Sequence, residues 1–262
     1  MTPRTLVILG SGYTGRFIIP LGLRVYTQVF STSRDPDHRL THVLSAQRLK
    51  FDLAEIDTWA NIPSEADLLW TFPAQPLESV RRCAAALRMH ARRLVVLGST
   101  SAYDVGNSQA YPPPWIDETA PIDRGKLRVQ GEEFLRMECS AIVLRVAGIY
   151  GPGRNPLDWI RQGRVGPSPK YVNLIHVEDL ASVCLAALDR GQGGEVYNVS
   201  DGMPRRWDEI VAIGQAHWNL SPTVSLPTQE PGKRIDTHKL RNTYGDIISH
   251  RDLFSALETL ER

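Results

Sequence analysis

A glycine-rich turn near the amino end constrains the fold of this chain more than any other feature. The segment TLVILG, residues 5–10, is typical of a short buried strand, and a helix-like segment follows it directly. Glycines allow a tight turn there and let backbone N–H groups approach a pyrophosphate, while the helix amino end adds partial positive charge. A purely structural turn is the alternative. The residues expected to hold the phosphates are Gly10, Ser11, Gly12, Tyr13, Thr14 and Gly15.

Strand-like and helix-like segments alternate after this turn, as they do in a doubly wound parallel α/β sheet. Further strands are expected at residues 27–33, 48–53, 66–72, 92–100 and 140–151. Helices are expected at residues 14–23, 77–91, 123–134, 177–190 and 252–262, with one more strand at 195–200. We therefore predict a dinucleotide-binding domain over residues 1–150 and a smaller substrate-binding lobe over residues 151–262, packed against it.

The composition argues against several classes of partner. The 262 residues include 30 Lys+Arg and 29 Asp+Glu, so no overall field attracts nucleic acid. No apolar run approaches the ~20 residues that a membrane span needs, and the amino end is too short for a signal-peptide core. Three widely spaced cysteines lack paired metal spacing and fit buried, reduced thiols. We expect a cytoplasmic protein that acts on a small molecule and uses no metal, nucleic acid or membrane; a homodimer is left open.

The end of the second strand bears on the choice of cofactor. NAD-binding chains usually place an acidic residue there, which binds the adenosine ribose. Here the strand ends in Ser31, Thr32 and Ser33, followed by Arg34. An arginine can pair with a 2′-phosphate, whereas Asp35 lies one position further on and is expected to point away. The pattern favours NADP over NAD, and the alternative is that Arg34 is a solvated surface residue.

Several motifs, in this order, resemble those of the extended short-chain dehydrogenase/reductase superfamily, the group of NAD-dependent epimerase/dehydratase-like proteins. The motifs, which span nearly the whole chain, are GSGYTGR, FDL, GSTSAYD, VLRVAGIYGPGR, NLIHVEDLA and GEVYNVSDG. The resemblance implies a Rossmann-type fold and a nicotinamide cofactor. It implies cofactor contacts, beyond the glycine turn, from Ser33, Arg34, Asp52, Phe72, Pro73, Ala74, Ala147, Gly148 and Ile149.

The same resemblance implies a place for the substrate. Ser99 falls where the family keeps a hydroxyl that binds the reacting oxygen, with Thr100 and Ser101 as close substitutes. Substrate contacts are implied for Tyr150, Arg154 and His176.

The chain departs from the family at the catalytic helix. The family's Y-x-x-x-K-x-x-x-E pattern, aligned on Glu132, puts Arg128 at the lysine and Arg124 at the tyrosine. An arginine stays protonated, so it can stabilise an oxyanion or hold the ribose but is a poor acid or base. Both arginines could instead be solvated residues. Other candidate acids are Tyr103, Tyr111, Tyr150 and His176, with Tyr103 preferred because it is expected on the rim of the cofactor cleft.

The sequence thus favours an NADP(H)-dependent oxidoreductase acting on a small carbonyl or alcohol. A sugar-type epimerase or dehydratase is one alternative, although the missing tyrosine counts more heavily against it. A catalytically silent NADP(H)-binding sensor or scaffold is the other, and Arg124 and Arg128 favour it.

Overall fold

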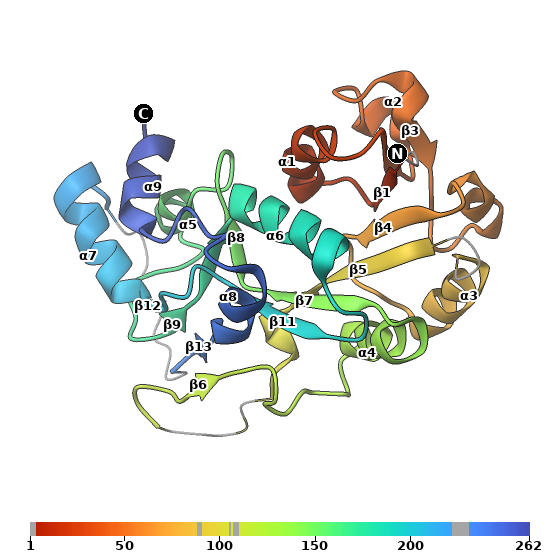
Figure 1. The fold of residues 1–262 in the computed structure, drawn as a ribbon. Helices are drawn as coiled ribbons and strands as arrows, with labels where there is room; N and C mark the ends of the chain where they lie inside the picture. The colour runs from red at the N-terminus through yellow and green to blue at the C-terminus, as the bar shows by residue number, and fades with distance from the viewer. Residues whose placement is uncertain (1–3, 88–90, 105, 107–109, 222–230) are drawn as a thin grey trace. The chain divides into compact units, whose positions relative to one another are not determined.

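A seven-stranded sheet is the largest element of the fold (Figure 1). The computed structural model describes residues 4–87, 91–104, 106, 110–221 and 231–262. The strand order is β11-β7-β5-β4-β1-β2-β3, and the pairs β1/β2, β1/β4, β2/β3 and β4/β5 are parallel. The strands are β1 (Thr5–Leu9), β2 (Gln28–Ser33), β3 (Arg48–Lys50), β4 (Ala66–Trp70), β5 (Ala91–Ser99), β7 (Ile142–Val146) and β11 (Val196–Val199). The predicted doubly wound α/β sheet is confirmed.

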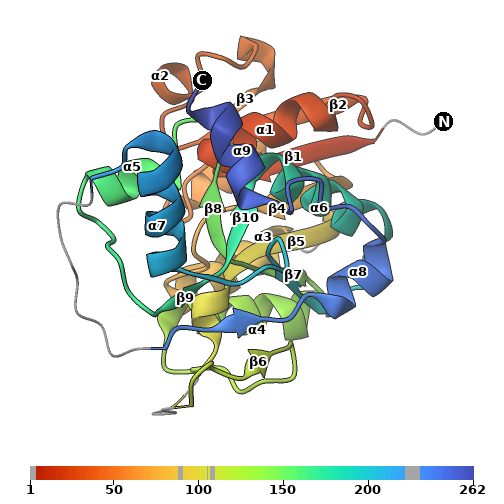
Figure 2. The same cartoon turned by 90° about the vertical axis from the view of Figure 1, so that its left-hand side faces the viewer.

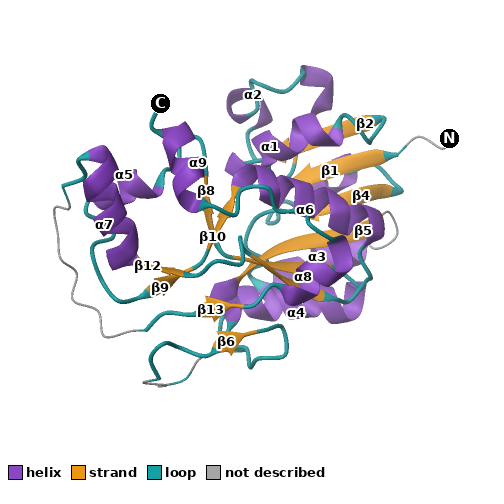
Figure 3. Cartoon of the chain, turned by 60° about the vertical axis from the view of Figure 1, so that its left-hand side comes forward, coloured by secondary structure: helices purple, strands orange, loops and turns teal. Residues whose placement is uncertain are grey.

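Helices cover both faces of this sheet, which explains why its central strands are apolar on both sides. Figure 3 shows α3 (Leu77–Leu87) and α4 (Leu127–Cys139) on one side, with α1 (Tyr13–Gly22) and α6 (Val177–Arg190) on the other. Alternate residues of β1 point to opposite faces of the sheet. Val7 and Leu9 pack in the core formed with α3 and α4. The short helices of this part are α2 (Pro36–Arg39) and three 3₁₀ segments, Ser45–Gln47, Ile56–Asn61 and Thr100–Ala102.

The cysteines agree with the expectation of buried thiols at two of three positions. Cys83 and Cys184 are fully buried, and burial raises the pKa of the Cys83 thiol to about 12. Cys139, at the end of α4, is partly exposed. None of the three forms a disulfide.

The described chain divides into two compact units that differ from the predicted cut at residue 150. Unit 1 comprises Met1–Ala102, Ile122–Arg145 and Leu180–Tyr197; unit 2 comprises Tyr103–Pro121, Val146–Asp179 and Asn198–Arg262. Residues 180–197 belong to unit 1 because they carry most of α6 and the first half of β11, which completes the sheet. Sequence order is therefore a poor guide to the division.

Unit 2 is built from short elements around its own core (Figure 2). Three two-stranded pairs, β8/β10, β9/β12 and β6/β13, replace a large sheet. Their strands are β6 (Trp115–Ile116), β8 (Gly148–Tyr150), β9 (Tyr171–Val172), β10 (Leu174–His176), β12 (Arg205–Arg206) and β13 (Arg234–Ile235). The helices are α5 (Pro156–Arg161), α7 (Trp207–Trp218), α8 (His238–Tyr244) and α9 (Leu253–Leu260). Apolar side chains of α5, α7 and α9 form most of this core.

Two predicted elements need correction. The strand expected at 140–151 is two strands, because the chain leaves the large sheet after Val146 and β8 then pairs with β10. The helix expected at 123–134 begins only at Leu127, because the Asp123 carboxylate accepts the Gly125 N–H in a turn. Arg124 therefore lies before the helix, whereas the predicted helix over residues 123–134 included both Arg124 and Arg128.

The helix predicted at residues 77–91 is shorter in the structure, as α3 (Leu77–Leu87). Residues 88–90 of the helix predicted at 77–91 lie outside the described residues, and residue 91 already belongs to β5. Within the described residues, no helix combines the length and the apolar character that crossing a bilayer requires.

Candidate functional site

The order in which the chain adds strands to the sheet reverses between β1 and β4. From β1 the chain goes to β2 and β3 on one side, then returns to place β4 on the other side of β1. In open parallel sheets, ligands bind outside the carboxyl ends of the strands at such a reversal. The glycine turn follows β1 here, and Phe72 follows β4, so both predicted segments lie at this position.

Gly10 makes a bend that both neighbouring strands hold in place. Its φ is +82°, a conformation that suits glycine, and an added Cβ would lie 2.6 Å from the ring of Phe72. Its N–H donates to Thr32 Oγ1 at 2.9 Å, and its carbonyl accepts the Thr71 hydroxyl at 2.5 Å. The adjacent Ser11 N–H donates to the Thr32 carbonyl at 2.9 Å. The bend is therefore fixed before any ligand arrives.

The bend leads straight into the amino end of α1, with Gly12 as the capping residue. Among the described residues, no side chain caps this end, and the first turn holds no acidic residue. The first N–H groups of an α-helix have no intrahelical acceptor, and the helix dipole adds positive potential there. An added Cβ at Gly15 would lie 3.1 Å from Ser11 Cβ, so the helix begins close against the bend. This end of α1 is suited to an anion.

The segment after β2 gives Arg34 and Asp35 different surroundings. Arg34 is exposed, and Ser33 Oγ accepts the Asp35 N–H at 3.2 Å. The Asp35 carboxylate instead caps α2 by accepting from the N–H and Nδ1 of His38, which lowers the pKa of Asp35. Asp35 thus faces its own helix, and Arg34 is the charged residue available beside Ser33.

The segments after β3 and β4 are ordered by local contacts. Asp52 sits in a turn after β3, where its Oδ1 accepts the Ala54 N–H at 2.9 Å. Phe72 packs against Trp70, with ring centroids 4.8 Å apart. Pro73 is exposed and Ala74 is buried, because Gly131 of α4 lies directly against the Ala74 backbone. A side chain at position 131 would collide with that backbone.

Ser99 ends β5, at the same edge of the sheet. Its Oγ accepts the Ser101 N–H at 3.1 Å, and Thr100 starts the short 3₁₀ segment that follows. Lys126, just before α4, donates from Nζ to the Ser101 carbonyl at 2.7 Å. The sequence analysis missed this lysine, although it is the only one in residues 123–134. The structure thus brings an ammonium group to the segment that holds Ser99.

The two arginines at the catalytic positions of the family are paired with buried glutamates. Arg128 Nε lies 3.0 Å from Glu132 Oε1, and the Glu132 carboxylate reaches the backbone of Gly98 in β5. Burial raises the pKa of Glu132, and the charge of Arg128 opposes this rise. Arg124 is largely exposed and lies 3.7 Å from Glu133, which also pairs with Arg136. These contacts support a structural role for Arg128.

The other predicted residues belong to unit 2. Tyr103 is buried, and its hydroxyl donates to Asn198 Oδ1 at 2.6 Å, so it packs inside unit 2 instead of lying on the rim of a cleft. The Tyr111 hydroxyl donates to the Pro169 carbonyl at 3.1 Å. Both hydroxyls donate to acceptors within unit 2, and Tyr111, unlike Tyr103, is half exposed.

Strands β8 and β10 bring the remaining candidates of unit 2 side by side. Tyr150 and His176 pair in register, and their rings meet edge to face with centroids 5.1 Å apart. Tyr150 is fully buried, its pKa is raised mainly by burial, and its hydroxyl has no hydrogen-bond partner among the described residues. Arg154 is exposed on the following turn. The segment before Tyr150 is buried at Ala147, exposed at Gly148 and half-buried at Ile149.

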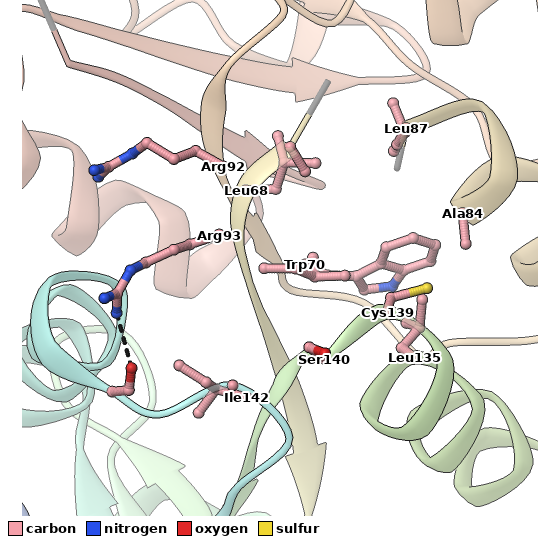
Figure 4. A pocket seen from close by; sticks show the side chains of 14 residues that line it. Leu68, Trp70, Ala84, Leu87, Arg92, Arg93, Leu135, Cys139, Ser140 and Ile142 are labelled. Atoms are coloured by element: carbon pink, nitrogen blue, oxygen red, sulfur yellow. Dashed lines mark hydrogen bonds between the residues drawn. The ribbon is translucent and has the colours of Figure 1, made fainter. Parts of the chain in front are cut away.

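A cavity of about 300 Å³ lies elsewhere in unit 1, beside the first residues of β5 and the last residues of α3 and α4 (Figure 4). Trp70 and Leu135 line it, and Arg93 at its edge donates to the Gly191 carbonyl at 2.8 Å. The first residues of β5 lie at the edge of the sheet opposite to the glycine turn. This cavity is therefore separate from the candidate cofactor site.

Replacing Arg128 by Met should lower the free energy of unfolding by about 2–4 kcal/mol at pH 8, because a buried Glu132 carboxylate would lose its partner. The loss should shrink toward pH 5. Without the cation, the pKa of Glu132 in the folded state rises further above its value in the unfolded state. The folded state then tolerates only the protonated carboxyl group, so the free energy of unfolding falls as the pH rises. Urea unfolding at both pH values measures this. The double variant Arg128→Met/Glu132→Gln should show little pH dependence; an equal loss for Arg128→Met at both pH values would contradict the assignment.

Comparison with known proteins supports the fold. No protein-family model matches the chain. The protein YeeZ of Escherichia coli (strain K12) is 31% identical over 122 residues, which cover 44% of this chain and only 42% of YeeZ. A functionally unknown conserved protein from Silicibacter pomeroyi DSS is 26% identical, with a TM-score of 0.76 over 98% of both chains. A short-chain dehydrogenase/reductase superfamily protein from Agrobacterium tumefaciens, solved with bound NAD, is 15% identical, with a TM-score of 0.78 over 98% of this chain and 96% of that one. The chain thus shares its fold with a short-chain dehydrogenase/reductase superfamily protein.

Proposed function

We propose that this protein binds NADP(H) at the carboxyl edge of its large sheet and acts as an oxidoreductase on a small carbonyl or alcohol. The observation that carries the proposal is the Gly10 bend, held by Thr32 and Thr71 at the reversal of the sheet. Backbone N–H groups at the uncapped amino end of α1 would bind the pyrophosphate. The solved Agrobacterium tumefaciens protein with bound NAD supports a nicotinamide cofactor for this fold.

Gly12→Ala tests the phosphate site directly. Gly12 is exposed, and the nearest atom to an added Cβ is 3.9 Å away, so the folded state should lose at most about 1–2 kcal/mol. The methyl group would stand at the entrance to α1, and NADPH binding measured by calorimetry should weaken at least about 10-fold, or about 1.4 kcal/mol.

Gly245→Ala is a control for a glycine-to-alanine change outside the phosphate site: Gly245 lies in unit 2, after α8, with open space around it, and its φ of +75° makes the change more costly for folding than Gly12→Ala. It should leave NADPH binding unchanged. Absence of NADPH and NADH binding by the unaltered protein, or equal binding by Gly12→Ala, would refute the proposed site.

The choice of NADP over NAD rests on Arg34, which is exposed beside Ser33 while Asp35 is bound to its own helix. Loss of a charge-assisted contact to the 2′-phosphate costs about 1.5–3 kcal/mol. Arg34→Ala should therefore weaken NADPH binding about 10- to 100-fold and leave NADH binding nearly unchanged. Arg39→Ala, which removes another exposed arginine five positions on, is the control. Equal weakening of both cofactors by Arg34→Ala would show that Arg34 does not read the phosphate.

The proposed chemistry assigns different tasks to Ser99 and Lys126. The cofactor would supply or accept the hydride, and solvent water would supply or accept the proton on the substrate oxygen. Ser99 Oγ accepts the Ser101 N–H, which leaves its own O–H to donate to the reacting oxygen of the substrate. The Lys126 ammonium, fixed on the Ser101 carbonyl, would stabilise negative charge on that oxygen. In this proposal Lys126 does electrostatically part of what the family's tyrosine and lysine do together.

A silent NADP(H)-binding module remains the second candidate, since Arg128 is tied to Glu132 and Tyr103 is buried. We expect turnover when the protein is incubated with NADPH and a panel of aldehydes, ketones and quinones. Lys126→Met should lower kcat about 10²- to 10³-fold, as loss of an oxyanion donor does. Lys239→Met, at a partly exposed lysine of α8 in unit 2, is the control.

The other outcomes of this assay identify the alternatives. NADPH binding without any turnover would favour the silent module over an enzyme. An oxidised cofactor that stays bound through purification would favour the epimerase or dehydratase.

A further inference from the structure

Unit 2 assembles a cluster of two histidines and one glutamate. His176 ends β10, Glu178 lies in the first turn of α6, and His250 lies in the segment just before α9. One ligand atom from each of these residues lies within 4.8 Å of the other two. His250 Nε2 is 3.7 Å from Glu178 Oε2, and His176 Nδ1 is 4.0 Å from the same oxygen.

We propose that His176, Glu178 and His250 bind one divalent transition-metal ion of the zinc type. Two imidazole nitrogens and one carboxylate oxygen are donors that Zn²⁺ and Co²⁺ prefer, whereas Ca²⁺ and Mg²⁺ prefer oxygen ligands alone. Three protein ligands leave a fourth position for water, as in exchangeable zinc sites.

Asp179 orients His250 in the way that metal-binding histidines require. The Asp179 carboxylate is buried and accepts from the backbone N–H groups of Ser249 and His250, at 3.0 and 2.8 Å. Its Oδ1 lies 3.1 Å from His250 Nδ1, so that nitrogen carries the proton. The lone pair of His250 is then on Nε2, the atom nearest to Glu178. A carboxylate behind a ligand histidine fixes the tautomer and strengthens the ligand.

His176 offers a neutral imidazole held in place by its surroundings. It is buried, and both burial and the neighbouring His250 lower its pKa. Its ring stacks on His250 with centroids 3.8 Å apart and meets the edge of Tyr150 on another side. Nδ1 accepts the Glu178 N–H at 3.4 Å, which is longer than the ~2.7–3.2 Å of a strong bond, so a metal ion can replace it.

Binding requires the cluster to contract and the two imidazole rings to turn out of their stacked arrangement, because each ring binds an ion in its own plane. Donor atoms around a tetrahedral zinc ion lie about 3.3 Å apart, given bonds of about 2.0–2.1 Å. The Glu178 side chain is 54% exposed and can rotate toward both histidines, and the His250 side chain is 30% exposed. The ion would be reached from solvent through these two residues, and it would tie the start of α6 to the segment before α9.

Zinc titration of tag-free, metal-stripped protein by calorimetry tests the proposal, with Co²⁺ as a spectroscopic probe of tetrahedral nitrogen and oxygen ligation. We expect one equivalent of Zn²⁺ to bind, and no comparable uptake of Mg²⁺. Glu178→Gln and His250→Ala should each weaken Zn²⁺ binding at least about 100-fold, and Asp179→Asn about 10- to 100-fold. Binding should also weaken in acidic buffer, because the ligand groups must be deprotonated to bind the ion.

His238→Ala is the matched control, because His238 is an exposed histidine whose Nδ1 lies 2.7 Å from Asp236, away from the cluster. It should bind Zn²⁺ as the unaltered protein does. Glu178→Gln changes a half-exposed side chain, and circular dichroism verifies that it folds. No zinc uptake by the unaltered protein, or undiminished uptake by both Glu178→Gln and His250→Ala, would overturn the proposal whatever the outcome for NADPH.

Discussion

The bend at Gly10 is the constraint on which the candidate cofactor site depends. It needs a positive φ, contact with Phe72 and hydrogen bonds to residues of two other strand ends. These bonds exist only because the parallel sheet delivers the carboxyl ends of β1, β2 and β4 to one edge. Thr32 and Thr71 thus hold the glycine turn from both sides. The turn directs the amino end of α1 toward the proposed position of the pyrophosphate.

The positive charges near the carboxyl edge of the large sheet are placed differently from those of the family's tyrosine–lysine pattern. Arg128 and Arg124 lie beside Glu132 and Glu133, and the burial of Glu132 makes its pairing with Arg128 costly to break. An arginine bound in this way stabilises α4 against β5 and has little freedom to act on a substrate. Lys126, placed by the turn that delays the helix, is the cation that contacts the segment after Ser99. A two-residue shift in position thus changes which side chain brings positive charge to the segment after Ser99.

Unit 2 shows how buried polar groups organise a region of short elements. Asn198 accepts from the Tyr103 hydroxyl and donates to the carbonyls of Ile116 and Asp236, which joins three separate segments. The Asp179 carboxylate likewise accepts the N–H groups of Ser249 and His250, which joins α6 to the segment around His250. Buried polar groups of this kind must be satisfied, so they specify one arrangement where short strands cannot do so alone. The cluster of His176, Glu178 and His250 is a consequence of that arrangement.

The sequence by itself determined the doubly wound sheet, the glycine turn and the segments that follow each strand, because apolar periodicity and glycine positions are local signals. It also located Ser99 and Arg34 correctly at the ends of β5 and β2. Only the tertiary structure decided where α4 begins, that Tyr103 is buried against Asn198, and that β8 leaves the large sheet. Each of these depends on a partner distant in the chain, and the same reason hides the pairing of His176 with His250, which the sequence separates but the fold stacks 3.8 Å apart.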